Sequence, residues 1–326
     1  MPSLQQGSIH LGRIAGIDLY LHWTWFLIAI FEIQNWQGRY SSVLWSALEY
    51  LALFAIVLTH EFGHALACRQ VGGTANRIML WPFGGVAYVD PPQRPGATLW
   101  SIAAGPLVNV ALLTVLGVPN LGVSNLGVPQ LAVPALFGWT LGWAHTMPNA
   151  YMLIERISWI NFGLLIFNML PIYPLDGGQI LRSLLWFPLG RAHSLLVVTI
   201  LGMFGIAGYF GLTLWRGSLW LGAIGIFMLM NCWGGFRHAR ALLQQAKLPR
   251  RKGFACPSCR TEPLLGERWK CGKCGQKFDT FLTGGICPHC AAQYSTTMCG
   301  DCGKSSPMGE WVDHSMAGPE VVNGGF

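Results

Sequence analysis

Charged side chains are scarce in this chain: they make up 11% of its 326 residues, and only 14 residues are acidic. A soluble enzyme of this length covers its surface with charged groups, so the composition argues against that class. Hydrophobic residues make up 52% of the sequence, and there are 15 tryptophans, which is typical of a polytopic membrane protein. From Leu99 to Met230 the charged residues are limited to Glu155, Arg156, Asp176, Arg182, Arg191 and Arg216.

Six apolar runs are each long enough to cross a hydrocarbon core of about 30 Å. They predict an all-α polytopic membrane protein with about six transmembrane helices. The first 18 residues lack a compact apolar segment followed by a cleavage site, so we expect no cleavable signal peptide. The runs lie at about 19–36, 43–68, 99–117, 157–175, 194–215 and 218–235.

The net charge of +7 is distributed unevenly between the two sides of the predicted membrane. The outer loops hold Arg39, Arg156 and Arg216, whereas most other lysines and arginines up to Lys252 fall on the inner side. This asymmetry predicts a multi-pass protein of the cell (inner) membrane with both termini in the cytoplasm. It also explains the charge without nucleic acid, which we do not expect as a partner.

Composition divides the chain into a membrane core at 1–236, a basic linker at 237–253, a cysteine-rich segment at 254–303 and a disordered C-terminus at 304–326. The linker is expected either to rest on anionic headgroups or to be plainly solvated. A pentapeptide repeat at 115–134 contains glycine and proline in most of its units. It predicts a re-entrant or interfacial cap, or a loop that only connects two spans.

His60, Glu61 and His64 form an H-E-x-x-H motif at the end of the second apolar run. On a helix, residues four apart lie on one face, so both imidazoles can bind one Zn²⁺. Glu61 then lies beside the metal, where it can deprotonate a metal-bound water. The motif therefore predicts a hydrolytic zinc centre at membrane depth.

A catalytic zinc site needs a third protein ligand, and Asp176 is the carboxylate near the inner end of another predicted span. Pro171 and Pro174 break the helix before it, and Gly177 and Gly178 permit a sharp turn. The alternative is that Asp176 caps the following helix. Counting spans brings His60 and Asp176 to the same, cytoplasmic side of the core.

These motifs resemble the site-2 proteases, which are zinc intramembrane metalloproteases of peptidase family M50. His60–His64 is similar to the family's first motif, 168–177 to its N-x-x-P-x-x-P-L-D-G motif, and 105–109 to its G-P-x-x-N motif. The resemblance implies His60, His64 and Asp176 as ligands and Glu61 as the base. The chain lacks a PDZ-sized insert and has a cysteine-rich tail where sporulation-type members have CBS modules, so substrate choice and regulation stay open.

Four further residues are candidates for substrate or oxyanion contacts. Asn109 and Asn168 are polar side chains near the predicted centre, although an interhelical hydrogen bond explains Asn109 equally well. Residues 77–90 predict a short membrane-associated β-hairpin around Gly84 and Gly85. Residues 86–89 of its second strand are the expected edge for pairing with an unwound substrate, and Gly85 and Val86 are the candidate contacts there.

Eight cysteines of the tail occur as four C-x-x-C knuckles, a strong signal for structural zinc. They predict two tandem zinc ribbons of small β-structure, with disulfides as the competing interpretation. With the catalytic ion, the prediction is one catalytic and two structural Zn²⁺, and the ribbons are expected to bind a protein partner. The knuckle residues are Cys256, Cys259, Cys271, Cys274, Cys287, Cys290, Cys299 and Cys302.

Together these patterns predict an enzyme, a zinc metalloendopeptidase that cuts transmembrane segments of membrane-anchored substrates within the lipid, as in regulated intramembrane proteolysis. One alternative is a non-catalytic zinc-binding membrane scaffold or a metal-handling protein. A purely metal-binding site has no need of a base such as Glu61 between its ligands. A further alternative is a membrane-tethered sensor whose tail carries the function.

Overall fold

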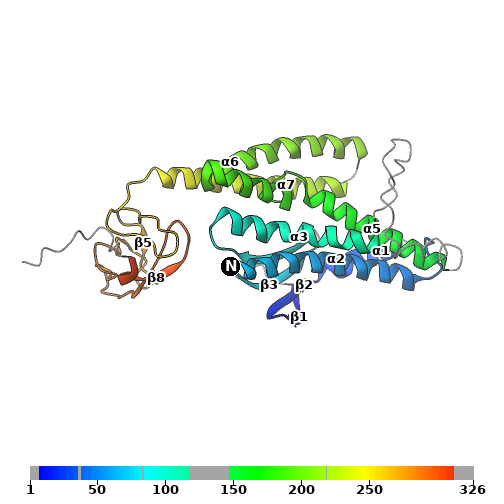
Figure 1. Ribbon diagram of the computed structural model, residues 1–326, viewed down its shortest axis with the longest axis horizontal. Helices are drawn as coiled ribbons and strands as arrows, with labels where there is room; N and C mark the ends of the chain where they lie inside the picture. The colour runs from blue at the N-terminus through cyan, green and yellow to red at the C-terminus, as the bar shows by residue number, and fades with distance from the viewer. Residues whose placement is uncertain (1–6, 36–37, 82–83, 118–146, 218, 312–326) are drawn as a thin grey trace, which may run out of the picture. The chain divides into compact units, whose positions relative to one another are not determined.

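The computed structural model describes all residues except 1–6, 36–37, 82–83, 118–146, 218 and 312–326 (Figure 1). The described chain forms two compact units, residues 1–240 and residues 241–326. The first unit holds the long apolar helices and one β-sheet, and the second holds the cysteine knuckles. Most of the repeat at 115–134 lies outside the described residues, so its predicted cap or connecting role stays a prediction.

Four helices of the described chain are long and apolar enough to cross a membrane: α2 (Val43–Gln70), α3 (Pro95–Leu116), α5 (Pro148–Asn168) and α6 (Asp176–Arg216). They contain or overlap the predicted spans 43–68, 99–117, 157–175 and 194–215. The last predicted span, 218–235, lies in α7 (Leu219–Ala246), a helix that is not one of these four. The predicted count of six is therefore confirmed only in part.

The first predicted span, 19–36, is wrong as a single helix. Its beginning is a strand, β2 (Ile17–His22), and the rest is α1 (Thr24–Asn35), whose 12 residues extend only about 18 Å. Ile17, Leu19, Leu21 and Trp25 are nonetheless buried against α2. The main-chain groups of β2 are hydrogen-bonded to β1 and β3, which is the condition under which non-helical backbone is tolerated at membrane depth.

A four-stranded sheet with the order β1-β2-β3-β4 lies beside α2 (Figure 1). The predicted hairpin at 77–90 is confirmed as β3 (Thr74–Trp81) and β4 (Gly84–Asp90), which pair antiparallel. The sequence did not reveal that β1 (Ser8–Ile14) and β2 extend it, with β2 parallel to β3. Because β4 is paired on one side only, it is an edge strand, as predicted.

The second unit contains two short hairpins, β5 (Trp269–Lys270) with β6 (Lys277–Phe278), and β7 (Thr296–Met298) with β8 (Ser305–Pro307). A 3₁₀ turn, Met308–Trp311, follows and buries Trp311 completely against Cys256, Phe281 and Cys299. The predicted disorder from 304 onward is therefore wrong for residues 305–311. Because the Trp311 indole completes this small core, the segment is held in place.

The basic linker predicted at 237–253 is also wrong as a separate region. Its first half is helical, since α7 continues to Ala246. In its second half, Arg250 forms a bidentate ion pair with Asp301 at 2.9 and 3.1 Å, and Arg251 pairs with Asp279. These arginines neutralise carboxylates of the cysteine-rich unit, so they are engaged within the protein rather than with headgroups.

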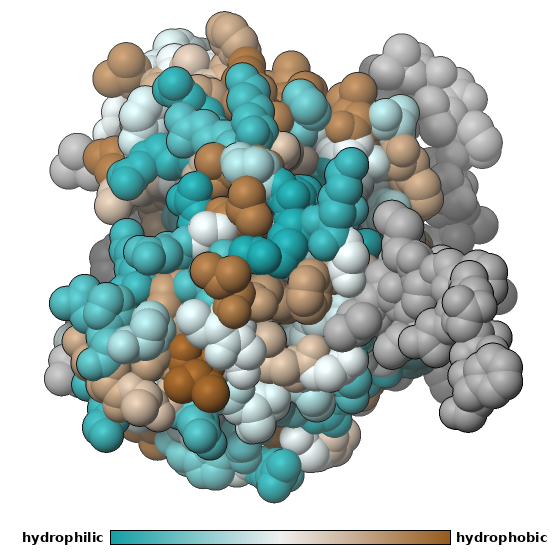
Figure 2. All heavy atoms as spheres, turned by 90° about the vertical axis from the view of Figure 1, so that its left-hand side faces the viewer, coloured by the Kyte–Doolittle hydropathy of each residue, from teal (hydrophilic) through white to brown (hydrophobic). Residues whose placement is uncertain are grey.

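Figure 2, which views the side of Figure 1 where β5 and β8 lie, shows a mixed surface of hydrophilic and neutral residues with scattered hydrophobic ones.

Candidate metal centre and active site

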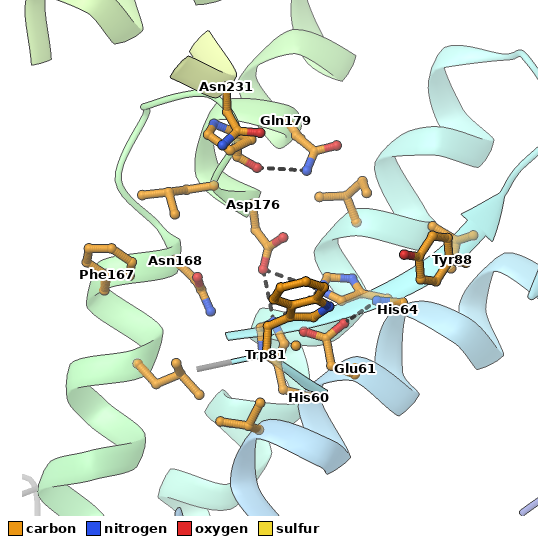
Figure 3. Close-up of a pocket in the computed structure, with 18 of the residues that line it drawn as sticks. His60, Glu61, His64, Trp81, Tyr88, Phe167, Asn168, Asp176, Gln179 and Asn231 are labelled. Atoms are coloured by element: carbon orange, nitrogen blue, oxygen red, sulfur yellow. Dashed lines mark hydrogen bonds and ion pairs between the residues drawn. The ribbon is translucent and has the colours of Figure 1, made fainter. Parts of the chain in front are cut away.

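Three side chains from two helices converge on one point (Figure 3). His60 and His64 lie one turn apart on α2, and Asp176 is the first residue of α6. Nε2 of His60 lies 3.1 Å from Nε2 of His64, and Oδ2 of Asp176 lies 3.0 and 3.3 Å from these two nitrogens. All three side chains are largely buried. The structure thus brings together the three predicted ligands.

The spacing of these atoms suits a tetrahedral zinc ion. Ligands bound at about 2.0–2.1 Å in a tetrahedron lie about 3.3 Å from one another, close to the three separations observed. Oδ2 of Asp176 is buried and receives no hydrogen bond from the described residues. Three electron-rich atoms facing one another without a shared proton repel each other, and a cation removes that repulsion. The donor set therefore fits Zn²⁺.

The outer nitrogen of each imidazole determines which nitrogen faces the centre. Nδ1 of His64 donates to the main-chain carbonyl of Ser101 at 2.9 Å, and Nδ1 of His60 donates to Oδ1 of Asn109. Because a carbonyl oxygen can only accept, each Nδ1 carries the proton and each Nε2 presents a lone pair. This is the arrangement in which histidine binds metal.

Glycine at position 105 lets α3 approach the imidazoles closely. A Cβ atom on Gly105 would lie 2.3 Å from Nε2 of His64 and 2.9 Å from Cε1 of His60. Both distances are far shorter than a normal contact of about 3.5 Å. Gly105 belongs to the G-P-x-x-N motif noted in the sequence, and its lack of a side chain leaves room for the two imidazoles.

The carboxylate of Glu61 lies beside the two imidazoles, and the residue as a whole is 6% exposed (Figure 3). Its Oε2 accepts a hydrogen bond from the main-chain N–H of Ala87 on β4 at 2.8 Å. The neighbouring Gly85 is equally close, since a Cβ atom there would lie 2.5 Å from Oε1. The edge strand therefore holds one carboxylate oxygen, and Oε1 remains to accept a proton.

A cavity of about 580 Å³ opens onto the centre and is lined by all four residues of the predicted centre together with β4, α5, α6 and α7. Its wall is largely apolar, with Val57, Ile102, Leu164, Phe167 and Phe227. Asn168, which was predicted, lies on this wall, and so does Gly85. Gln179 and Asn231 also line the cavity, and neither was predicted from the sequence. Gln179 lies three residues after Asp176, so the two residues share a face of the helix that begins at Asp176. That spacing was a readable signal for Gln179.

Asn109 is not placed to contact a substrate. It is completely buried, its Oδ1 faces His60, and its Nδ2 donates to Oδ1 of Asn161 at 2.7 Å. The predicted substrate or oxyanion contact is therefore corrected to the alternative, an interhelical hydrogen bond. Asn161 was missed, although a polar residue inside an apolar run at 157–175 was a visible signal. The side chain of Val86, another predicted contact, lies outside the described residues, whereas its backbone pairs with Met79.

The eight tail cysteines gather into two groups of four, which nest instead of following one another. Sγ–Sγ distances of 3.6–3.7 Å join Cys271 to Cys290 and Cys274 to Cys287. The outer group joins the first knuckle, Cys256 and Cys259, to the fourth at 3.7 Å. Disulfide sulfurs lie about 2.05 Å apart, whereas four thiolates around zinc at about 2.3 Å lie about 3.8 Å apart. The tandem order is therefore wrong, and two Cys₄ zinc sites remain the prediction.

Tyr294 supports the inner cysteine group. Its hydroxyl lies 3.1 Å from Sγ of Cys271 and accepts from the N–H of Gly272 at 2.7 Å. The hydrogen bond from this hydroxyl, helped by main-chain N–H groups, lowers the pKa of the Cys271 thiol from 9.0 to about 5. A thiolate is the form that binds zinc, so Tyr294 favours metal binding near neutral pH.

Long apolar helices around a buried His-His-Asp centre define a class of helical membrane protein with a candidate metal site. The family model for peptidase family M50 matches residues 49–212, which include all four residues of that centre. The chain belongs to peptidase family M50, and the predicted membership in the site-2 protease family is confirmed.

Two curated relatives illustrate the similarity. Zinc metalloprotease MJ0392 of Methanocaldococcus jannaschii is 32% identical over 195 residues, which cover 60% of this chain and 50% of that protein. Rip3 of Mycobacterium tuberculosis is 30% identical over 246 residues, covering 68% of this chain and 56% of Rip3. The chain therefore spans only half or slightly more of these relatives. A solved structure, the site-2 protease from Methanocaldococcus jannaschii, is 26% identical, covers 70% of this chain and 95% of that chain, and gives a TM-score of 0.46.

Proposed function

We propose that this protein is a zinc endopeptidase that hydrolyses peptide bonds in transmembrane segments of membrane-anchored substrates. The observation that carries the proposal is the convergence of Nε2 of His60, Nε2 of His64 and Oδ2 of Asp176 within 3.3 Å, beside the carboxylate of Glu61. Three ligands leave one tetrahedral position for water, as in catalytic rather than structural zinc sites. The largely apolar cavity supports an apolar peptide as substrate.

Each residue of the centre has a defined task in this proposal. Bound by His60, His64 and Asp176, zinc would supply a Lewis acid that lowers the pKa of a water ligand and polarises a peptide carbonyl. Oε1 of Glu61 accepts the proton of the attacking water and later delivers it to the departing amide nitrogen. The N–H of Ala87 holds Oε2, so the carboxylate keeps one orientation throughout. Asn168 on the cavity wall is the polar side chain proposed to hold the substrate strand.

The edge of β4 is the proposed docking place for an unwound substrate. Ala87 faces Ile78 of β3 in the antiparallel pair, yet its N–H points to Glu61, so this residue directs its main-chain groups to the unpaired side. By strand alternation, Gly85 and Val89 do the same. Their carbonyls can accept N–H groups of a substrate strand lying between β4 and the metal ligands. A helical substrate must unwind to offer those groups.

The proposal also covers location and partners. Positive residues on the inner side favour a multi-pass protein of the cell (inner) membrane with cytoplasmic termini, so water reaches the centre from the cytoplasm. The two Cys₄ groups are proposed to bind one structural zinc each and to contact a protein partner. Their folding energy would come largely from the metal, because the unit has a small core.

The proposal is tested by comparing Glu61→Gln with the natural protein in membranes. We expect Glu61→Gln to retain zinc at the centre and to leave membrane-anchored substrates uncut in a comparison of membrane proteomes. Glu49→Gln is the matched control, because Glu49 is a buried carboxylate on the same helix about 16 Å away. A scaffold or metal-handling protein would behave identically with Glu61 or Gln at position 61, and that outcome would reject the enzyme.

A further inference from the structure

Asn161 on α5 touches no metal ligand, yet a chain of hydrogen bonds connects it to His60. We infer that Asn161 is a positioning residue of the metal centre, which acts through Asn109 to fix the proton of His60 on Nδ1. The inference deepens the proposed function, because it rests on His60 being a metal ligand.

The chain of hydrogen bonds begins at a main-chain carbonyl, which has only one possible role. Nδ2 of Asn161 donates to the main-chain oxygen of Asn109 at 2.9 Å. Because that oxygen can only accept, the amide of Asn161 has one orientation, with its NH₂ toward the carbonyl and Oδ1 toward the side chain of Asn109. Oδ1 then accepts from Nδ2 of Asn109 at 2.7 Å.

The same reasoning continues to the ligand. With Nδ2 of Asn109 directed to Asn161, its Oδ1 must face Nδ1 of His60. An oxygen at that place requires a proton on Nδ1, which leaves Nε2 of His60 as a lone pair toward the metal. A rotated Asn109 amide would set its NH₂ against Nδ1 and favour the other tautomer, whose Nε2–H cannot bind metal. Asn161 excludes this rotation, because it would bring two Oδ1 atoms together.

The two histidines differ in how much they depend on such help. His64 donates to the main-chain carbonyl of Ser101, an acceptor that has no second orientation. His60 relies on a side-chain amide, whose oxygen and nitrogen can exchange places unless something fixes them. Asn109 and Asn161 are both completely buried, so water cannot supply the missing partner. This is why two asparagines in succession support His60, whereas a single main-chain carbonyl is enough for His64.

The test measures Co²⁺ binding by the full chain, with Co²⁺ as a spectroscopic probe for zinc. Four-thiolate cobalt absorbs strongly through its sulfur ligands, so the cysteine sites are distinguished from the His-His-Asp site and serve as an internal reference. We expect Asn161→Leu to weaken Co²⁺ binding at the His-His-Asp site by about 10- to 100-fold, as for other residues that orient metal ligands. Ser158→Ala is the matched control. Ser158 also connects α5 to the end of α3, because its hydroxyl donates to the carbonyl of Gly117, but this hydrogen bond does not involve Asn109 or His60. It should leave Co²⁺ binding unchanged.

A second background separates positioning from packing. In Asn109→Asp both side-chain oxygens accept, so rotation no longer matters, and adding Asn161→Leu should change Co²⁺ affinity by less than about threefold. Asn161→Asp keeps an acceptor for Nδ2 of Asn109 and should bind Co²⁺ normally, even if its thermal stability falls. It also keeps the test available if the leucine variant does not fold.

Equal losses from Asn161→Leu in both backgrounds would overturn the inference, because they indicate a packing role. Unchanged Co²⁺ affinity in Asn161→Leu alone would overturn it as well. Failure of the natural protein to bind Co²⁺ at the His-His-Asp site would instead reject the proposed function, so the two failures are distinguishable.

Discussion

The close approach of Gly105 on α3 to the imidazole of His64 leads to a specific prediction for Gly105→Ala. The added Cβ would lie 2.3 Å from Nε2 of His64, where a normal contact needs about 3.5 Å. Either the imidazole or α3 must therefore move by about 1 Å. Metal–ligand distances tolerate deviations of only about 0.2 Å. We expect at least one of the three ligands to leave the metal's coordination sphere.

The expected magnitude follows from typical zinc affinities. A structural zinc site with four ligands binds with about 10–16 kcal/mol, or roughly 2.5–4 kcal/mol per ligand. At about 1.4 kcal/mol per tenfold change, losing one ligand weakens binding by about 10²- to 10³-fold. Proteolysis should fall in parallel at limiting zinc, because the centre is then mostly empty.

The assay is a Co²⁺ or Zn²⁺ titration of the full chain, accompanied by thermal unfolding to verify that the core is folded. Gly96→Ala is the matched control on the same helix, since nothing lies within 4 Å of its added Cβ. That control should bind metal normally. A folded Gly105→Ala protein whose metal affinity stays within about threefold of the natural value would refute the steric reasoning.

Three further substitutions probe other parts of the molecule. Gly85→Ala should displace the carboxylate of Glu61, whose Oε1 lies 2.5 Å from the added Cβ, so turnover falls at saturating substrate while the metal content is unchanged; equal turnover would contradict this. Tyr294→Phe removes the hydrogen bond that lowers the pKa of Cys271 to about 5. The thiolate is then lost at a higher pH as the solution is acidified, so the inner cysteine group should release Co²⁺ at a higher pH than it does in the natural protein, whereas release from the outer group is not expected to shift. In the natural protein the Tyr40 hydroxyl donates to Oε2 of Glu49 at 2.7 Å, and Glu49→Ala removes that acceptor. The free energy of unfolding should fall by about 1–3 kcal/mol while proteolysis is retained. An unchanged midpoint of thermal unfolding would count against this.

The three candidate metal ligands could be predicted because their signals are local or depend only on helix direction. His60 and His64 share a helix face by spacing alone. Placing Asp176 near them required one further inference, that the helices before and after α3 run in the same direction, so that their C-terminal ends lie on the same side. That relation is independent of the first predicted span, so its error did not affect the site. The placement of Asp176 beside both histidines confirms the convergence.

The sheet could be predicted only where its strands are neighbours in sequence. β3 and β4 follow each other directly, so their turn signals were readable. β2 pairs with β3 in parallel across more than fifty residues, and no local pattern announces such a contact. Its buried positions alternate, but they merge into the apolar run of α1. Periodicity in a short apolar run does not separate a buried strand from a helix.

Pairs of residues that lie far apart in the sequence could not be predicted for the same reason. The nested order of the cysteine knuckles and the pair formed by Asn109 and Asn161 both depend on which distant residues meet. Spacing shows that each residue can form a bond, but not with which partner. The sequence therefore left two roles open for Asn109, a substrate contact or an interhelical hydrogen bond, and only the packing of α3 against α2 and α5 decides between them.

Ala87 connects the base to the proposed substrate strand. Its N–H holds Glu61, and its carbonyl belongs to the same unpaired edge on which a substrate strand would lie. Under the proposed pairing, the register of the substrate on β4 therefore fixes the distance from a given peptide carbonyl to Glu61. A shift of two residues moves that carbonyl by about 6.6 Å, and a shift of one turns its neighbouring side chains to the other face. Each docking register should consequently expose a single peptide bond, so cleavage-site choice depends on which substrate segment pairs with β4 after unwinding.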